Sequence, residues 1–382
     1  MAINGPARIP LLTDAEMPDV IRNNKDLPKV NIFRALANHP DAFVPWNRFA
    51  AYVIGRSELS PRQREIVFLR TGWNHQSDYE FGQHRVIGKR AGLTDEEILN
   101  TAIGPDAPEW SAEDRVLLQA ADALYTSADI PDDVWAELDK HYNDLQKLDV
   151  VIGVAQYTLV CMVLKTARVP LDDEIDGLPD IEGSRLQRGP YLRLDGQARI
   201  QPLSAADIEK QIGDDKDLQQ LTKVIKGLDR INVVATLANH SKFYTHWNRF
   251  GAYVFNESEL APRQREIVFL RTGWNLQCDY EFGQHYKIAL GIGLTHDEIM
   301  NIARGPEAPG WAPEEKALLC AVDELCAETD ISDATWAALD THFNDKQKLD
   351  VIFGTGNYTL VSMALKAIRV QLDDDIEGLP EI

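Results

Sequence analysis

Glu80 and His84 are the side chains in this sequence whose types and spacing best suit proton transfer. Residues four apart lie on one face of an α-helix, and Ser77, almost one turn earlier, shares that face. Glu65 lies on the preceding predicted helix, so it could meet His84 across a helical hairpin. A carboxylate in contact with an imidazole fixes its tautomer and raises its pKa. These residues therefore predict a general acid/base group that works near neutral pH.

A plainer interpretation of the same spacing is a solvated Glu–His pair, which stabilises a helix by roughly a few tenths of a kcal/mol. The retained aromatic residues Trp73, Tyr79 and Phe81 also permit a packing role for this block. The chemical interpretation gains support because the whole block occurs twice in the chain. The second set consists of Glu266, Cys278, Glu281 and His285.

Other kinds of site have weaker signals. Arg70 and Arg271 could each hold a substrate carboxylate bidentately, and an ion pair with a nearby acid is the simpler interpretation of each. No His-Glu-x-x-His pattern, dense histidine cluster or glycine-rich phosphate loop occurs, so we expect neither a metal nor another cofactor. The acidic runs 172–176 and 373–377 are typical of solvated segments, with calcium binding as the alternative.

The elements that must position these residues belong to an internal repeat. Leu59–Leu93 recurs as Leu260–Leu294 at an offset of 201 residues, and the eight tryptophans form pairs at the same offset. Near the start of each copy the offset is 191, so we expect an insertion in copy 2 within Asp207–Asp217. We predict copy 1 at 1–182, a linker at 183–190 and copy 2 at 191–382, with the copies related by a pseudo-twofold axis.

Helix signals dominate within each copy. Ser60, Pro61 and Gln63 form a capping box with proline at the first helical position, whereas Ala261 weakens the equivalent cap in copy 2. Strand signals are sparse, so we predict an all-α fold with six to eight helices per copy. The helices expected in copy 1 span residues 60–73, 76–91, a segment capped by Thr94, 111–125, 132–142 and 145–169.

Composition narrows the possible partners. The 382 residues include 39 basic and 60 acidic side chains, a net charge of −21 that disfavours nucleic acid and anionic membrane surfaces. The sequence contains no run of 18 apolar residues, so we expect no membrane-spanning helix. The first 30 residues do not resemble a signal peptide. The four cysteines include no Cys-x-x-Cys pair, which favours a reducing, cytoplasmic location.

The repeated block resembles the carboxymuconolactone decarboxylase family, whose superfamily also contains the AhpD-like alkylhydroperoxidases. The matching pattern in copy 1 is Leu59-x-x-Arg62-x-x-Glu65, Asn74-x-x-x-Asp78-Tyr79-Glu80-x-x-x-His84 and Gly92-Leu93-Thr94-x-x-Glu97-Ile98. The AhpD-like branch places a Cys-x-x-Cys pair between the glutamate and the histidine. Those positions hold Ser77 and Glu80 in copy 1, and Cys278 and Glu281 in copy 2, so dithiol peroxidase activity is not expected.

The resemblance implies a cofactor-free lyase that acts on a small oxygenated, carboxylated or lactone-type metabolite. His84 and His285 would transfer the proton, with Glu65 and Glu266 orienting the imidazoles. Glu80 and Glu281 would serve as second acid/base groups. The predicted substrate-binding residues are Arg70, Arg271, Trp73, Trp274, His75 and Cys278. Family members are helical subunits that form trimers or hexamers, so the resemblance implies two tandem AhpD-like helical domains in this chain and a homo-oligomer, a trimer of two-copy chains.

Several alternatives stay open at this stage. The same residues could serve an isomerase or a hydratase/dehydratase, or the chain could be a non-enzymatic helical binding or assembly module. A thiol-dependent antioxidant acting through Cys278 is a further alternative. The two copies need not be equivalent, because His75 corresponds to Leu276, Ser77 to Cys278, and Arg85 to Tyr286.

Overall fold

The structure is a computed structural model that describes residues 5–25, 27–193, 196–212 and 231–382. These residues contain helices and connecting segments but no β-strand, so the predicted all-α class is confirmed. In copy 1 the helices are α1 (Asp19–Arg22), α2 (Asn31–Leu36), α3 (Pro40–Gly55), α4 (Pro61–Asn74), α5 (Asp78–Arg90), α6 (Asp95–Ile103), α7 (Ala112–Ser127), α8 (Asp132–Leu138) and α9 (Asp144–Thr166). The single-turn α1 brings copy 1 above the predicted range of six to eight helices.

Copy 2 repeats this order. Its helices are α10 (Ala205–Ile212), α12 (Asn232–Leu237), α13 (Ser241–Ala252), α14 (Pro262–Asn275), α15 (Asp279–Gly291), α16 (His296–Arg304), α17 (Pro313–Glu328), α18 (Asp333–His342) and α19 (Asp345–Ala367), with the short segments η2 (Ala238–His240) and η3 (Tyr253–Glu257). The predicted insertion at Asp207–Asp217 lies partly outside the described residues.

The capping box predicted at Ser60 is confirmed, whereas the helix expected over 76–91 begins later, at Asp78. The Ser60 hydroxyl accepts a hydrogen bond from Gln63 N, and Ser60 N donates to the Gln63 side chain at 2.9 Å. Ala261 has no side-chain oxygen, so only the second bond, from Ala261 N to Gln264, remains in copy 2. The helix predicted over 132–142 ends earlier in copy 1, at Leu138, although its counterpart α18 extends to His342.

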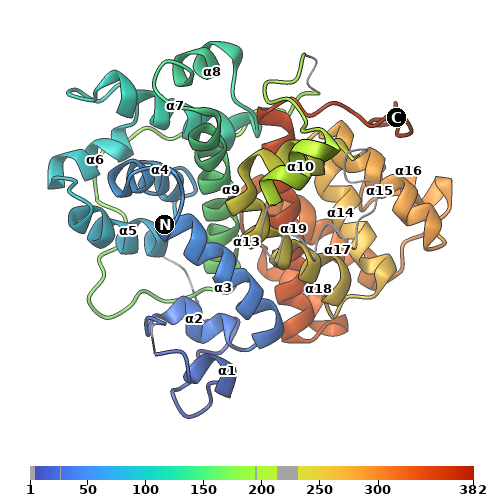
Figure 1. Cartoon of the computed structure of the whole chain (residues 1–382). Helices are drawn as coiled ribbons and strands as arrows, with labels where there is room; N and C mark the ends of the chain where they lie inside the picture. Colours follow the sequence, from blue (N-terminus) through green and yellow to red (C-terminus); the bar gives the residue numbers. More distant parts are fainter. Residues whose placement is uncertain (1–4, 26, 194–195, 213–230) are drawn as a thin grey trace.

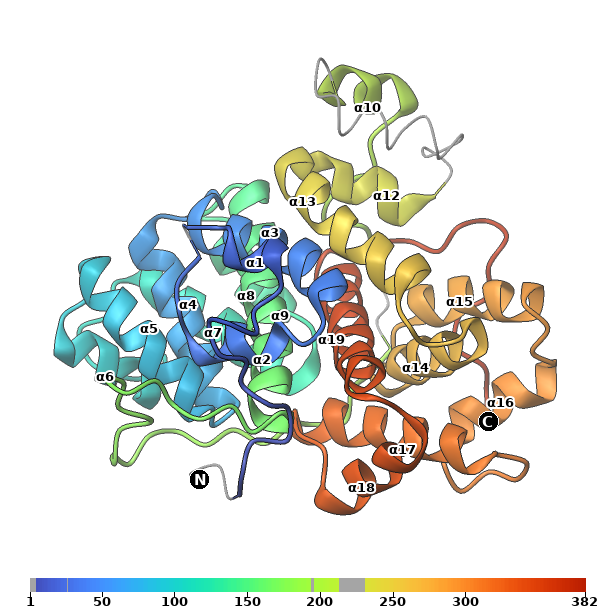
Figure 2. The same cartoon turned by 90° about the horizontal axis from the view of Figure 1, so that it is seen from below.

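Helices α9 and α19 pack against each other at the centre of the molecule, and α3 packs against α13. Figures 1 and 2 show α9 and α19 side by side, with the other copy-1 helices on one side and the copy-2 helices on the other. Helix α9 has the length and apolar composition of a membrane-spanning helix, but its most apolar stretch is entirely buried inside the protein. This long apolar helix therefore forms, with α19, the core of the joined copies.

Reciprocal polar contacts cross between the copies. Tyr52 Oη of copy 1 lies 3.1 Å from His240 Nε2 of copy 2, and both groups contact Asp149 Oδ1. The equivalent group in the other direction consists of Tyr253, His39 and Asp350. Arg8 pairs with Asp333, and its counterpart Arg199 pairs with Asp132. Such exchanged contacts are what two copies related by a pseudo-twofold axis must make.

The segment predicted as a linker, 183–190, is irregular but tightly packed against copy 1. Ser184 accepts hydrogen bonds from the side chains of Arg70 and Trp73. A Cβ atom at Gly183 would lie 2.3 Å from the Trp73 ring, so glycine is needed for this close approach. The domain boundaries at 182 and 191 stay a prediction, because the joined core does not by itself divide the chain.

Candidate functional site

The α4–α5 hairpin positions the predicted acid/base residues of copy 1. After α4 ends at Asn74, Gln76 adopts a left-handed φ of 52°, and the Ser77 hydroxyl then caps α5 by accepting from Glu80 N. Gly72 allows the two helices to approach, since a Cβ there would meet Phe81 N at 3.1 Å. The same turn occurs in copy 2, where Cys278 replaces the capping serine.

The hairpin brings Glu65, Glu80 and His84 together, and we call them the Glu–His cluster of copy 1. His84 Nδ1 lies 2.7 Å from Glu65 Oε2, and His84 Nε2 lies 3.1 Å from Glu80 Oε1. All three side chains are almost fully buried. In the Glu–His cluster of copy 2 the corresponding residues are Glu266, Glu281 and His285, with distances of 2.8 Å and 3.0 Å.

The carboxylates change the protonation of the imidazoles. Burial alone would lower the pKa of His84, but the neighbouring Glu65 and Glu80 outweigh it and raise the pKa to about 9. The same balance, with Glu266 as the main carboxylate, raises the pKa of His285 to about 10. Burial raises the pKa of Glu80 to about 7, against the opposing effect of His84. At neutral pH the cluster therefore holds an imidazolium beside a carboxyl group that is close to half-protonated.

The two clusters differ in how the second glutamate is bonded. Glu80 Oε1 is buried without a hydrogen-bond partner of good geometry among the described residues, although it lies near His84 Nε2. In copy 2, Glu281 Oε1 lies 3.0 Å from His285 Nε2 and helps to raise the pKa of that histidine. Glu80 therefore has an oxygen that could accept a proton or a hydrogen bond from a bound molecule.

Aromatic rings from the core helix cover each imidazole. Tyr157 stacks on Phe68 with ring centroids 3.9 Å apart and meets the His84 ring edge-on at 4.8 Å. Burial and the nearby glutamates raise the pKa of the Tyr157 hydroxyl far above its usual value, so this group stays protonated. Tyr358 occupies the same position against His285.

One cavity in each copy opens beside the turn that precedes α5 or α15. The copy-1 cavity, of about 440 Å³, is lined by residues that include His75, Ser77 and Lys165. The copy-2 cavity, of about 540 Å³, is lined by residues that include Cys278 and Lys366. Both volumes suit a small molecule. Along α5 and α15 their linings reach Asp78 and Tyr280, just before Glu80 and Glu281, and include neither those glutamates nor either histidine of the clusters.

The structure does not bring the predicted arginines to the clusters. Arg70 is fully buried, and its five donor groups bind both Asp122 oxygens, the carbonyls of Thr101 and Ala102, and the Ser184 hydroxyl. No donor is left for a substrate, so Arg70 fastens α4 to α6, α7 and the linker segment. Arg271 binds Asp323 and two carbonyls in the same way and lines a separate cavity.

The remaining predicted binding residues divide between the core and the cavities. Trp73 packs edge-on against Phe81 and donates from its indole nitrogen to Ser184 O at 2.7 Å, and Trp274 makes the equivalent ring contact with Phe282. His75 lines the copy-1 cavity, where burial and the cationic Arg188 and Lys165 lower its pKa. His75 is therefore a neutral ring, with Arg188 donating to its Nδ1 at 3.1 Å.

Cys278 lines the copy-2 cavity, yet its surroundings suppress thiolate chemistry. Burial, together with Glu281, raises the pKa of this thiol to about 12. Ser362 lies close enough to Cys278 to influence its pKa, whereas in copy 1 the two residue types are exchanged and Ser77 acts on Cys161. Each copy therefore holds one thiol and one hydroxyl at this contact, and neither copy holds a dithiol. No group of potential metal ligands occurs in the described ranges.

Comparison with known proteins identifies the repeated unit. A family model described as the carboxymuconolactone decarboxylase family matches residues 40–123 and, separately, residues 241–324. The chain carries two carboxymuconolactone decarboxylase family domains in tandem. Each matched segment begins with the first residue of α3 or α13 and contains the complete Glu–His cluster of its copy. A search of the curated proteins finds no match to this chain.

Two solved structures resemble one family domain at low identity. The first is a protein of unknown function from Agrobacterium tumefaciens described in connection with the antioxidant defence protein AhpD, with 20% identity and a TM-score of 0.35 over 36% of this chain and 96% of that one. The second is an uncharacterized peroxidase-related protein from Ralstonia eutropha JMP134 with an alkylhydroperoxidase AhpD core, with 20% identity and a TM-score of 0.38 over 44% of this chain and 93% of that one.

Sequence reasoning missed the residues that α9 and α19 contribute to the family domains. Tyr157, Lys165 and their counterparts Tyr358 and Lys366 lie outside the matched segments but reach the clusters or the cavities. The repeat retains all four residues, which was an available signal. Their position in a long apolar helix made a packing role the natural interpretation of the tyrosines.

Proposed function

We propose that the chain is a cofactor-free lyase that uses Glu/His acid–base chemistry on a small oxygenated metabolite carrying a carboxylate or a lactone. The observation that carries the proposal is the buried carboxylate–imidazole–carboxylate arrangement, which occurs in both family domains with contacts between 2.7 and 3.1 Å. Burial excludes water from the imidazole, which strengthens its interaction with charge that develops on a substrate.

The proposed reaction is a decarboxylation. The bond between the carboxyl carbon and its neighbour breaks, carbon dioxide leaves, and the electron pair moves into a conjugated carbonyl of the substrate to give a dienolate. His84, held by Glu65, then donates a proton to the dienolate carbon, and Glu80 returns a proton to the ring. The pKa of Glu80, about 7, suits this exchange because an acid/base group transfers protons best when its pKa is near the working pH.

The cavity beside each cluster is the proposed substrate entrance. Ser77 lines the copy-1 cavity and caps the helix turn that carries Glu80, so a bound molecule would be separated from the cluster by this turn alone. Glu80 Oε1 lies 3.1 Å from His84 Nε2 without a hydrogen bond of good geometry, so it could receive a proton from a bound molecule. Isomerisation or hydration/dehydration would need the same proton transfers and uses the same residues.

One observation favours a second candidate, the non-enzymatic helical module. The Glu–His clusters are buried and the lining of each cavity ends before the histidine, as expected if the clusters are internal ion pairs. A thiol peroxidase has less support, because burial keeps Cys278 protonated and no dithiol lies at either site. The descriptions of the two structural neighbours make peroxide consumption worth measuring beside lyase activity.

The decisive experiment compares the wild-type chain with the double variant His84→Ala/His285→Ala. A panel of carboxylated lactones is screened for released carbon dioxide, and circular dichroism checks that both proteins are folded. We expect turnover to fall by about 10²–10⁴-fold in the double variant, the usual contribution of one acid/base group. Unchanged turnover in a folded double variant would end the lyase proposal and leave the helical module.

The assembly and location of the chain are proposed on the same basis. A trimer of two-copy chains would reproduce the hexamer of single family domains, and light scattering coupled to size exclusion would measure it. A clean monomer would remove the proposal. All four cysteines are free thiols, which supports a reducing, cytoplasmic environment.

A further inference from the structure

The two cavities occupy equivalent places but are lined by different charges. Each contains a lysine from the end of a central helix, Lys165 from α9 in the copy-1 cavity and Lys366 from α19 in the copy-2 cavity. Neither lysine takes part in the acid/base chemistry proposed above. The chain has a net charge of −21, so a lysine that lines a cavity is a candidate for binding an anionic ligand there.

Lys366 is built into the wall of the copy-2 cavity. It is only 5% exposed, and its ammonium donates to Leu276 O at 2.7 Å and to Ser127 O at 3.3 Å. An ammonium has three donors, and the third makes no hydrogen bond to a described residue, although the centroid of the Tyr191 ring lies 5.6 Å from Lys366 Nζ, so this donor could turn to a ligand in the cavity. Burial lowers the pKa of Lys366, so a bound anion would stabilise its charged form.

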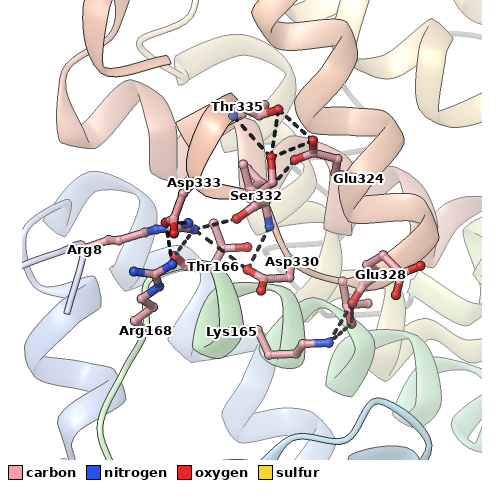
Figure 3. Close-up of polar contacts among 12 residues, drawn as sticks. Arg8, Lys165, Thr166, Arg168, Glu324, Glu328, Asp330, Ser332, Asp333 and Thr335 are labelled. Atoms are coloured by element: carbon pink, nitrogen blue, oxygen red, sulfur yellow. Dashed lines mark hydrogen bonds and ion pairs between the residues drawn. The ribbon is translucent and has the colours of Figure 1, made fainter. Parts of the chain in front are cut away.

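Lys165 is held differently in the copy-1 cavity. Its ammonium lies near Glu328 O at 2.7 Å, Thr329 Oγ1 at 3.2 Å and His75 O at 3.3 Å, which occupies all three donors. Figure 3 shows Lys165 directed at the copy-2 segment that carries Glu328 and Asp330. This lysine therefore serves to join the copies.

The two cavities also differ in the number of acidic residues that line them. The charged residues described around the copy-1 cavity are Lys165, Arg168 and Arg185 with Asp78, Glu328 and Asp330. Those around the copy-2 cavity are Lys366, Arg369 and Arg193 with Asp279. The copy-1 counterpart of Glu328 is the uncharged Ser127, and the counterpart of Asp330 is Asp129, which is bound by Arg369 at 2.5 and 3.1 Å.

We propose that the copy-2 cavity is a binding site for a small organic carboxylate, held by Lys366 and Arg193, and that the copy-1 cavity binds such an anion more weakly. The inference rests on the proposed function to the extent that it assigns the carboxylated ligand to one copy. Arg193 is half-exposed and lies 3.7 Å from Asp279, and one of its terminal nitrogens donates to Leu379 O and Pro380 O, so the other terminal nitrogen is the one that could meet an incoming anion. The two cavities of the duplicated chain would then differ in role: the copy-2 cavity would bind the anion, whereas the basic and acidic residues that line the copy-1 cavity would balance each other.

The test is isothermal titration calorimetry of the full chain with succinate, a compact dicarboxylate, and with 1,4-butanediol as its uncharged analogue. We expect one succinate per chain and no binding of the diol. Lys366→Met keeps the aliphatic stem but removes the charge, so we expect at least a tenfold loss of affinity. Lys165→Met is the matched control at the equivalent helix end, and we expect it to keep the wild-type affinity.

A pair of charge exchanges tests the stated cause. Glu328 places a carboxylate at the copy-1 cavity, and Ser127→Glu would place one at the equivalent position beside the copy-2 cavity. We expect this variant to weaken succinate binding by about tenfold, as for one lost ion contact. Glu328→Ser should leave binding in copy 2 unchanged. No heat with millimolar succinate, or equal losses from Lys366→Met and Lys165→Met, would overturn the proposal. The histidine double variant should still bind succinate, so failure of the anion site and failure of the lyase proposal remain distinguishable.

Discussion

Replacing Arg70 should destabilise the protein without changing its chemistry. Arg70→Met removes a fully buried guanidinium whose donors bind Asp122 at 2.6 and 2.9 Å and two backbone carbonyls at 2.9 and 3.0 Å. Asp122 keeps only the hydrogen bond from Asn74, at 2.8 Å. Removing one partner of a buried ion pair typically costs about 3–5 kcal/mol. We expect a loss of that size in the free energy of unfolding, measured by urea denaturation.

Two further variants test whether the lost stability comes from the buried Arg70–Asp122 ion pair. Arg62→Met breaks partly exposed ion pairs with Glu97 and Asp114, so it should cost less than about 1 kcal/mol. The double variant Arg70→Met/Asp122→Leu removes both buried charges and should recover part of the lost stability. Turnover per folded molecule should stay within about twofold of wild type in Arg70→Met. A stable Arg70→Met protein with no turnover would refute this reasoning and return Arg70 to substrate binding.

Three further outcomes follow from the buried ionisable groups. The rate of turnover should change with an inflection near pH 7, where Glu80 titrates, and Glu80→Gln should remove that inflection from the pH–rate profile. Because the folded pKa values of His84 and His285, about 9 and 10, exceed the unfolded value near 6.5, their stabilisation is complete below about pH 6.5 and is lost as the pH rises through 9–10. Urea denaturation between pH 7 and 10 should show this fall, and the fall should be smaller in His84→Gln/His285→Gln. A thiol reagent should label Cys320 fastest in the folded protein, since the other thiols are buried, and mass spectrometry showing Cys278 labelled first would contradict the suppressed reactivity described above.

The Glu–His contact could be predicted from sequence because it is local. Glu65 and His84 belong to consecutive helices joined by a tight turn, and the four-residue spacing from Glu80 to His84 sets the second contact. The capping pattern at Ser60 fixed where the first of those helices begins. The repeat then supplied the pseudo-twofold arrangement, because equal units in one chain pack as the subunits of a dimer do.

The partners of the charged side chains could not be predicted, because they are distant in sequence. Arg70 meets Asp122 only after α4 and α7 pack, and no local pattern distinguishes that arrangement from a free guanidinium. A lysine near the end of a helix, such as Lys165 or Lys366, normally reaches solvent beside the helix C-terminus. Here the other copy covers it, so its burial depends on how the copies are joined.

The exchanged Tyr–His–Asp contacts make the halves of the chain mutually dependent. Separating the copies would leave Asp149 and Asp350, both buried carboxylates, without the histidine that the opposite half supplies. Each half would also uncover the apolar flank of its central helix at the same moment. The chain should consequently unfold in one cooperative transition. Two halves expressed from separate genes should be stable only when they associate with each other.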